Sequence, residues 1–139
     1  MISAKAKLSL KLLLAVLLIW SPFPLERDTI HPRKLPSLKV GTASYYGKHQ
    51  QGQLMANGRR FNRWLLTAAS RTLPLGSLAR VTYLKTRKSV VVRITDRGPF
   101  IAGRIIDLSE AAAKRIDLMD DGIGTVIVEA LPKKKHNKG

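Results

Sequence analysis

The sequence contains no cysteine, and this absence removes several kinds of chemistry. Without thiols the chain has no disulfide framework, no Cys-ligated metal and no thiol nucleophile. Histidine is also scarce, since the three present (His31, His49 and His136) lie far apart and lack the spacing of a zinc site. We therefore expect no metal and no organic cofactor.

Acidic residues are few as well. The 25 Lys and Arg residues outnumber the 9 Asp and Glu residues, which gives a net charge of +16 at neutral pH. Residues 39–132 alone carry 15 basic and 7 acidic side chains, a net charge of +8. Such a balance favours an anionic partner, whether nucleic acid, a membrane surface or an acidic cell-wall polymer. Aromatic residues make up only 6% of the chain and form no aromatic-basic recognition motif, so we expect no nucleic-acid partner.

The N-terminal segment lacks an apolar run long enough to span a bilayer comfortably. Residues 12–20 are continuously apolar, three lysines precede them, and a Ser-Pro-Phe-Pro segment ends the run. This arrangement is typical of a signal peptide, so residues 1–24 are interpreted as one, with an uncleaved anchor helix as the alternative. Either interpretation predicts an exported protein, periplasmic or elsewhere in the cell envelope.

The remaining sequence divides into a linker, one domain and a tail. Residues 25–38 mix charge and proline without periodicity and are interpreted as a linker, and residues 132–139 are expected to be a disordered basic tail. Residues 39–131 suffice for one domain. Short strands are predicted at 39–46, 65–69, 79–83, 89–95, 105–108 and 124–130, and a short helix at 110–115. The pattern indicates a mainly β fold, a small six-stranded barrel with one short helix.

The chain is organised around residues 89–108, which are predicted to form a strand, a loop and a second strand. Apolar residues alternate with others across residues 90–94, the period of a half-buried strand. Asp96 stands where this strand stops, just before a Gly-Pro pair, and Asp107 lies among apolar residues of the second strand. Carboxylates in such apolar, strand-end settings are the first candidates for chemistry in this chain.

Six segments between residues 40 and 130 occur in the order known from one protein family. They are GTASYYG (41–47), ANG (56–58), LTAA (66–69), TLPLGSLARVT (72–82), SVVVRITDRGPF (89–100) and GRIIDLSEAAA (103–113). Together they resemble the rare lipoprotein A (RlpA-like) proteins, whose domain is a double-psi β-barrel. Active members are endolytic lytic transglycosylases of cell-wall remodelling and septation, which cut peptidoglycan glycan strands and prefer strands without stem peptides. The resemblance implies the same fold and substrate here.

The resemblance also implies a carboxylic acid at the centre of the reaction. Cleaving a glycosidic bond needs a proton for the leaving oxygen and stabilisation of an oxocarbenium-like centre. A lytic transglycosylase uses the muramyl 6-hydroxyl as the attacking group, so one acid/base serves twice. Asp96 matches the family's catalytic aspartate, and Asp107 matches one that related expansin-type barrels need. The alternatives are a loop carboxylate bonding local amides for Asp96 and, for Asp107, organisation of the helix entry beside Ser109.

Two of the three catalytic positions of active members are replaced. Their histidine is Ser70 here, and their glutamate after Asn-Gly is Arg59. Ser70 does not titrate near neutral pH, and Arg59 is a fixed cation. Two hypotheses follow, a lytic transglycosylase or a catalytically degenerate barrel that binds glycan without cutting it. His49, in a loop that we expect beside the groove, is a candidate substitute for the missing histidine.

The motifs supply the candidate substrate-binding residues, which are Tyr45, Tyr46, Asn57, Arg59, Thr67, Ser70 and Arg97. Adjacent strand residues point to opposite faces, so one of the two tyrosines is expected to pack inside while the other is free to stack on a sugar ring. A cluster of cations is expected around the groove, formed by Arg59, Arg60, Arg63 and Arg71. Arginines there suit muramyl carboxylates or another anionic wall polymer. We expect a monomer, without a lipid anchor because no cysteine can carry one.

Overall fold

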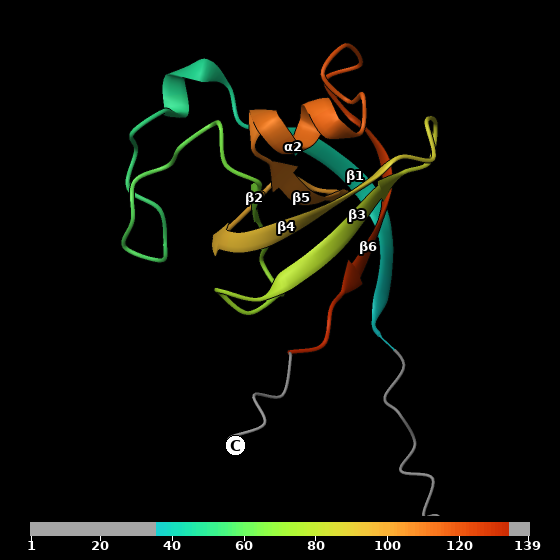
Figure 1. Ribbon diagram of the computed structural model, residues 1–139, viewed down its shortest axis with the longest axis horizontal. Coiled ribbons are helices and arrows are strands. Elements are labelled where there is room, and N and C mark those ends of the chain that lie inside the picture. The colour runs from blue at the N-terminus through green and yellow to red at the C-terminus, as the bar shows by residue number, and fades with distance from the viewer. Residues whose placement is uncertain (1–35, 134–139) are drawn as a thin grey trace, which may run out of the picture. The chain divides into compact units, whose positions relative to one another are not determined.

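The computed structural model describes residues 36–133, which form a closed β-barrel with one short α-helix (Figure 1). The signal peptide predicted at 1–24, most of the linker and nearly all of the basic tail lie outside the described residues. The elements are β1 (Leu38–Tyr45), a 3-10 turn η1 (Lys48–Gln50), β2 (Thr67–Ala69), β3 (Leu78–Tyr83), β4 (Ser89–Asp96), β5 (Arg104–Leu108), α2 (Glu110–Arg115) and β6 (Gly124–Ala130). The predicted mainly β fold with one short helix is confirmed, and each predicted strand has its counterpart.

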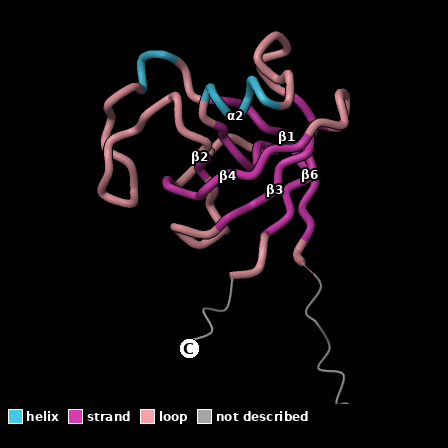
Figure 2. The backbone as a smooth tube through the Cα atoms, viewed as in Figure 1, coloured by secondary structure: helices cyan, strands magenta, loops and turns pink. Residues whose placement is uncertain are grey.

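The six strands, drawn in magenta in Figure 2, close in the order β1-β5-β2-β4-β3-β6. Two neighbouring pairs, β1 with β5 and β2 with β4, are parallel, and the other four are antiparallel. β2 has only three residues, yet it joins β4 to β5. The ends of the two strands that carry Asp96 and Asp107 are therefore held on either side of one short strand.

The barrel interior is filled by the alternate residues that the sequence pattern assigns to it. In β4, Val90, Val92 and Ile94 are buried, whereas the intervening Val91 and Arg93 are exposed. α2 lies across one end of the barrel (Figure 1) and buries Ala112 and Ala113 completely. Burying such side chains removes apolar area from water, which is the main force holding small barrels together.

The helix begins where the sequence predicts. The Ser109 hydroxyl accepts a hydrogen bond from the Ala112 amide, which is an N-cap, and Lys114 and Arg115 occupy the last turn. Ser109 also accepts from the Thr67 amide, so the cap ties the helix to β2. The side chain of Ser109 is fully buried. One hydroxyl thus joins the helix, the β5–α2 junction and the central short strand.

The long connection between β1 and β2, residues 46–66, projects from the side of the barrel (Figure 1). Met55 and Phe61 bury their side chains and anchor it. Within it, a small hairpin turn is closed by a bridge between Leu54 and Arg60, and Gly58 at its tip has a φ of +81°, a conformation that favours glycine. We call residues 54–60 the ANG turn.

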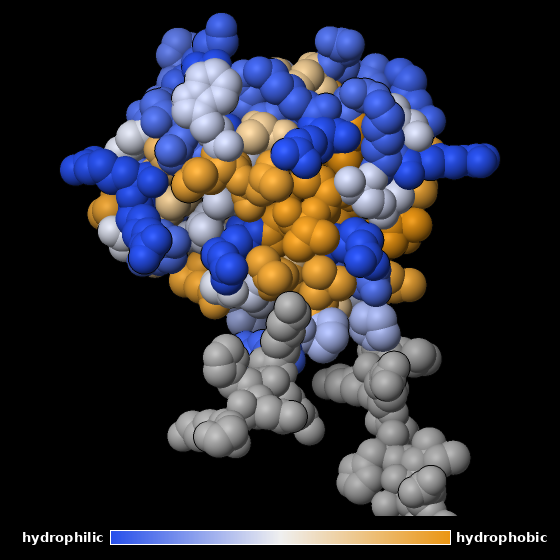
Figure 3. Space-filling model, viewed as in Figure 1, coloured by the Kyte–Doolittle hydropathy of each residue, from blue (hydrophilic) through white to orange (hydrophobic). Residues whose placement is uncertain are grey.

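The molecular surface is strongly mixed in character. Figure 3 shows apolar side chains across the centre of one face, over β3 and β4, with hydrophilic side chains around them. Among residues 36–133 no helix is long and apolar enough to cross a membrane. The same residues contain no cluster of three or more His, Asp or Glu side chains placed to hold a metal ion.

Candidate functional site

Asp96 occupies the last position of β4, and its half-buried carboxylate accepts three hydrogen bonds. Oδ2 accepts from the Tyr46 hydroxyl at 2.9 Å. Oδ1 accepts from the backbone amides of Ala56 at 2.9 Å and Arg97 at 2.8 Å. A carboxylate has about four lone-pair positions, so one remains on Oδ2. The carboxylate is therefore oriented from three sides and keeps one acceptor position available.

Tyr46 is fixed as the donor in this arrangement. Its ring meets Phe61 edge-on, with the ring centroids 4.9 Å apart. Burial, followed by the hydrogen bond to Asp96 and the charge of that carboxylate, raises the pKa of Tyr46 far above its ordinary value. The phenol therefore stays protonated at neutral pH. Tyr46 serves to hold Asp96, and its ring is already packed against another ring.

The two predicted catalytic carboxylates are brought together by β2. Ala69 pairs with Asp96 in β4 on one side and with Asp107 in β5 on the other. Asp107 is buried, and its Oδ1 accepts from Arg104 Nη2 at 2.5 Å and Nε at 3.2 Å. The charges of Asp107 and Arg104 both act on the pKa of Tyr46, which places this ion pair in the same electrostatic neighbourhood. Ser109 caps the start of α2, and the Asp107 carboxylate bonds Arg104 and not the helix.

Ser70, at the histidine position of active relatives, makes a structural turn. It is 2% exposed, and its hydroxyl accepts from the amides of Thr72 at 3.3 Å and Leu73 at 3.1 Å. The Arg97 guanidinium stabilises the same turn, because its Nη1 donates to the carbonyls of Ser70 and Leu73 at 2.8 and 2.7 Å. The backbone amide of Ser70 donates to the Asp96 carbonyl. Four hydrogen bonds therefore hold this turn, and its backbone is bonded to that of Asp96.

The ANG turn is attached to the end of β4. Besides the Ala56 amide that bonds the Asp96 carboxylate, the Asn57 amide donates to the Thr95 carbonyl at 3.2 Å. The Asn57 side chain accepts from the Arg59 amide and so stabilises the turn. Arg59 is exposed on this turn. The position that is a glutamate in active relatives is thus held beside the end of β4, with a cation on it.

A hollow of about 510 Å³ lies between the ANG turn, the start of β2 and the end of β4. Its lining residues are Met55, Asn57, Arg59, Arg60, Asn62, Leu65, Leu66, Thr67, Arg93 and Thr95. A second hollow, of about 290 Å³, is bordered by Ser70, Thr72, Leu73 and residues of β1. Asp96 lines neither, although its neighbour in sequence, Thr95, lines the larger one. We call the larger one the arginine hollow.

The other candidates are spread over the domain. Tyr45 packs against the core, with its hydroxyl 3.5 Å from the Met119 carbonyl, so it is the inward member of the tyrosine pair. His49 is exposed in η1 and is not among the groups that bond the Asp96 carboxylate.

The expected arginine cluster is only partly formed. Arg59 and Arg60 line the arginine hollow, whereas Arg63 pairs with Glu110 at 2.8 Å and Arg71 donates to the Arg104 carbonyl. Sequence reasoning missed Arg93 as a third cation of the hollow. The sequence does contain a signal for it: Arg93 lies two residues before Thr95 in β4, and residues two apart on a strand share a face.

Comparison with known proteins identifies the family. Residues 38–128 match the family described as "Lytic transglycolase". The chain belongs to this family. One relative, the endolytic peptidoglycan transglycosylase RlpA of Pasteurella multocida, is 52% identical over 98 residues, which are 70% of this chain and 33% of the relative. The chain thus spans about a third of the length of that curated relative.

Solved structures with the same fold are more distant in sequence. The Streptomyces papain inhibitor superposes with a TM-score of 0.58 at 20% identity, covering 71% of this chain and 98% of the inhibitor. An expansin variant of Clavibacter michiganensis in complex with cellohexaose gives a TM-score of 0.55 at 18% identity, covering 69% of this chain and 51% of the expansin. At these identities the comparison shows the double-psi barrel fold alone, and the family assignment rests on the sequence match.

Proposed function

We propose that this lytic transglycolase-family domain cleaves peptidoglycan glycan strands that lack stem peptides, with Asp96 as the acid/base. One observation carries the proposal. Asp96 ends β4 with its carboxylate oriented by three donors and with one acceptor position left on Oδ2. The family membership and the 52% identical RlpA relative support the same substrate. Since peptidoglycan lies in the cell envelope, the proposal agrees with the export predicted from residues 1–24.

The chemistry needs one proton to move twice. Protonated Asp96 gives its proton to the glycosidic oxygen as the bond to muramyl C1 breaks. The muramyl 6-hydroxyl then bonds to C1, and its proton passes to the Asp96 carboxylate, which restores the acid. The products are a strand ending in 1,6-anhydromuramic acid and a strand with a free 4-hydroxyl. Oδ2 is the atom proposed to carry the proton, because Oδ1 is occupied by two backbone amides.

Asp107 is proposed to act through charge. Its carboxylate is buried against Arg104 one strand away from Asp96 across β2. A fixed negative charge at that place favours the positive charge that develops at C1 in an oxocarbenium-like transition state. The tight pairing with Arg104 limits this contribution, so Asp107 is assigned a supporting role.

A second function is favoured by the replaced positions. Ser70 uses its hydroxyl to hold two backbone amides, and Arg59 is an exposed cation, so neither supplies an acid or a base. A domain with one of the three catalytic groups would bind glycan strands and leave them intact. Such a domain would locate a cell-wall complex on stretches of naked glycan.

One assay separates the two functions. Purified protein is incubated with glycan strands freed of stem peptides, and the products are examined for anhydromuramyl ends by mass spectrometry. Cleavage that is lost in Asp96→Asn and retained in the exposed control Asp120→Asn would establish the transglycosylase. Strands that co-sediment with the protein and stay intact would establish the binding domain. Neither cleavage nor co-sedimentation would overturn both.

A further inference from the structure

The arginine hollow carries a charge pattern that the acid/base chemistry does not use. Three of its ten lining residues are Arg59, Arg60 and Arg93, and no Asp or Glu lines it. We propose that the hollow is an anion subsite that binds the free lactyl carboxylate of a muramyl residue. This inference rests on the proposed function for the choice of polymer, and it assigns the hollow a role in recognising strands whose stem peptides have been removed.

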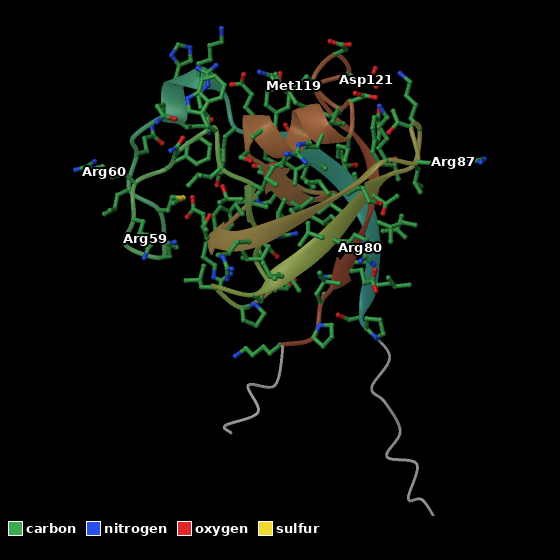
Figure 4. The ribbon with its side chains drawn as sticks, in the orientation of Figure 1. Arg59, Arg60, Arg80, Arg87, Met119 and Asp121 are labelled. Atoms are coloured by element: carbon green, nitrogen blue, oxygen red, sulfur yellow. The ribbon has the colours of Figure 1, made fainter. Side chains whose placement is uncertain are left out.

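The guanidinium groups are partly fixed and partly free. Arg60 Nη1 donates to the Gly52 carbonyl and Arg93 Nη1 to the Gly76 carbonyl, each at 2.9 Å. These bonds use one nitrogen of each group and leave the other donors available. Within residues 36–133, the Arg59 guanidinium has no hydrogen bond or ion pair. Figure 4 shows Arg59 and Arg60 together on the loop that projects from the barrel.

The guanidinium groups of Arg59, Arg60 and Arg93 are exposed and share one hollow, so their positive charges add and favour a bound anion. Like charges repel, and a carboxylate satisfies two N–H donors of one arginine at once. Of the cations that the sequence suggested for this region, Arg63 is neutralised by Glu110, with its side chain 19% exposed. The arginines of the hollow have no such partner among the described residues. A bound carboxylate would supply the missing negative charge.

The rest of the lining suits a sugar. Met55, Leu65 and Leu66 present apolar surface, and asparagine and threonine side chains add polar groups. A volume of about 510 Å³ lies in the range of small-ligand sites, which is roughly 300–1,000 Å³. A sugar ring with an acidic substituent has both kinds of surface. The lining therefore fits a muramyl residue better than an isolated inorganic anion.

The hollow is connected to the candidate acid. Thr95 lines it, and Asp96 is the next residue of β4. The ANG turn carries Arg59 and also supplies the amide of Ala56 that bonds Asp96 Oδ1. A muramyl carboxylate bound by Arg59 would thus pull on the same turn that orients the carboxylate of Asp96. Binding of the naked strand and orientation of the acid are coupled through one short segment.

The test measures binding without relying on cleavage. Asp96→Asn protein is titrated with naked glycan strands and with the same strands after methyl esterification of their carboxylates. We expect esterification to weaken binding about tenfold or more, as loss of charged hydrogen bonds does. Arg59→Gln with Arg93→Gln should weaken binding to the free-acid strands by a similar factor and remove the effect of esterification.

A matched control removes the same charge elsewhere. Arg87→Gln with Arg115→Gln takes two exposed cations away, and Figure 4 shows Arg87 on the opposite side of the barrel from Arg59. This variant should bind like the parent and keep its sensitivity to esterification. The single Arg59→Gln, an exposed change, guards against misfolding of the double variant. If both double variants lost the same affinity for the strands, net positive charge alone would explain binding, and the proposal would be overturned.

Two further outcomes are decisive. Equal affinity for esterified and free-acid strands would overturn the carboxylate subsite even if the protein cleaves both. A poly(glycerol phosphate) competitor that displaces the strands from the parent at equal charge concentration would show that the hollow prefers phosphodiesters, which also overturns it. A protein without cleavage activity that still distinguishes the two strand forms would retain the subsite and lose only the transglycosylase function.

Discussion

The Tyr46 hydroxyl donates to Asp96 Oδ2 at 2.9 Å, across 50 positions of sequence. Tyr46 follows directly after β1, and Asp96 ends β4, so the bond exists only once the barrel has closed. Phe61 from the β1–β2 connection holds the tyrosine ring. The carboxylate that the motif identifies is thus positioned by a residue of a different motif.

Removing the Tyr46 hydroxyl should lower the activity that depends on Asp96 more than it lowers the stability of the fold. Tyr46→Phe keeps the ring packed on Phe61 and deletes the donor to Oδ2. A hydrogen bond to a charged group contributes about 1.5–3 kcal/mol, so we expect kcat/KM for naked strands to fall about 10-fold or more. Product yield by mass spectrometry and urea unfolding measure the two effects. Tyr45→Phe is the control, because its hydroxyl makes only a 3.5 Å contact with the Met119 carbonyl. Equal activity in the two variants would contradict the positioning role.

The same residue should govern stability in alkali. Burial raises the pKa of Tyr46 in the folded protein, followed in size by its hydrogen bond to Asp96. In the unfolded chain the phenol ionises near its ordinary value of about 10. The unfolded state therefore loses its proton first as the pH rises. The stabilising contribution is complete below about pH 10 and declines above it, by up to about 1.4 kcal/mol per pH unit.

Urea unfolding between pH 9 and pH 11.5 tests this sign. The parent should lose stability above pH 10 more steeply than Tyr46→Phe. Tyr83, whose pKa is raised by its hydrogen bond to Asp121, contributes equally to both proteins. Parallel curves for parent and Tyr46→Phe would mean that the phenol ionises alike in the folded and unfolded chain.

Local patterns allowed most of the barrel to be predicted. Each signal acts within a few residues: the alternation in β4, the cap at Ser109 and the Gly-containing turns. The structure confirms the strand, at Ser89–Asp96, and the helix, at Glu110–Arg115. The family resemblance added the double-psi barrel, which no local pattern contains. β1 begins at Leu38, inside the predicted linker, because residues 38–43 pair with β6.

The site was less accessible to sequence reasoning. Asp96 and Asp107 were predicted as candidates from their motifs, whereas their hydrogen-bond partners Tyr46 and Arg104 were not predicted, because those contacts form only when the barrel closes. The β1–β2 connection has no periodicity, so nothing local indicates that its ANG turn bonds the end of β4. Arg93 was not predicted because the alternation in β4 shows only that its side chain points outward. Which residues lie opposite that outward face depends on the folded β1–β2 connection.

The Arg104–Asp107 pair should be a source of stability. Their side chains are 22% and 11% exposed, so removing one partner leaves a poorly hydrated charge. We expect Arg104→Gln to lower the unfolding free energy by about 2–3 kcal/mol, and Arg104→Gln with Asp107→Asn to recover part of the loss. Urea unfolding of the double-mutant cycle measures the coupling. Additive losses would mean that the two charges are independently solvated.

Restoring a histidine at position 70 should not by itself restore the acid/base set of active relatives. Ser70 is 2% exposed, and its hydroxyl accepts from the amides of Thr72 and Leu73. Ser70→Ala is expected to cost about 1–2 kcal/mol, since two backbone donors lose their acceptor. Ser70→His adds an overpacked ring to that loss, and we expect a cost of about 2–4 kcal/mol with no gain in anhydromuramyl product. Ser89→Ala, whose exposed hydroxyl bonds the Thr82 hydroxyl, is the control for loss of a hydroxyl that holds no backbone amide. A more active Ser70→His protein of unchanged stability would show that the turn at Ser70 yields to a larger side chain, and that the missing histidine alone limits cleavage.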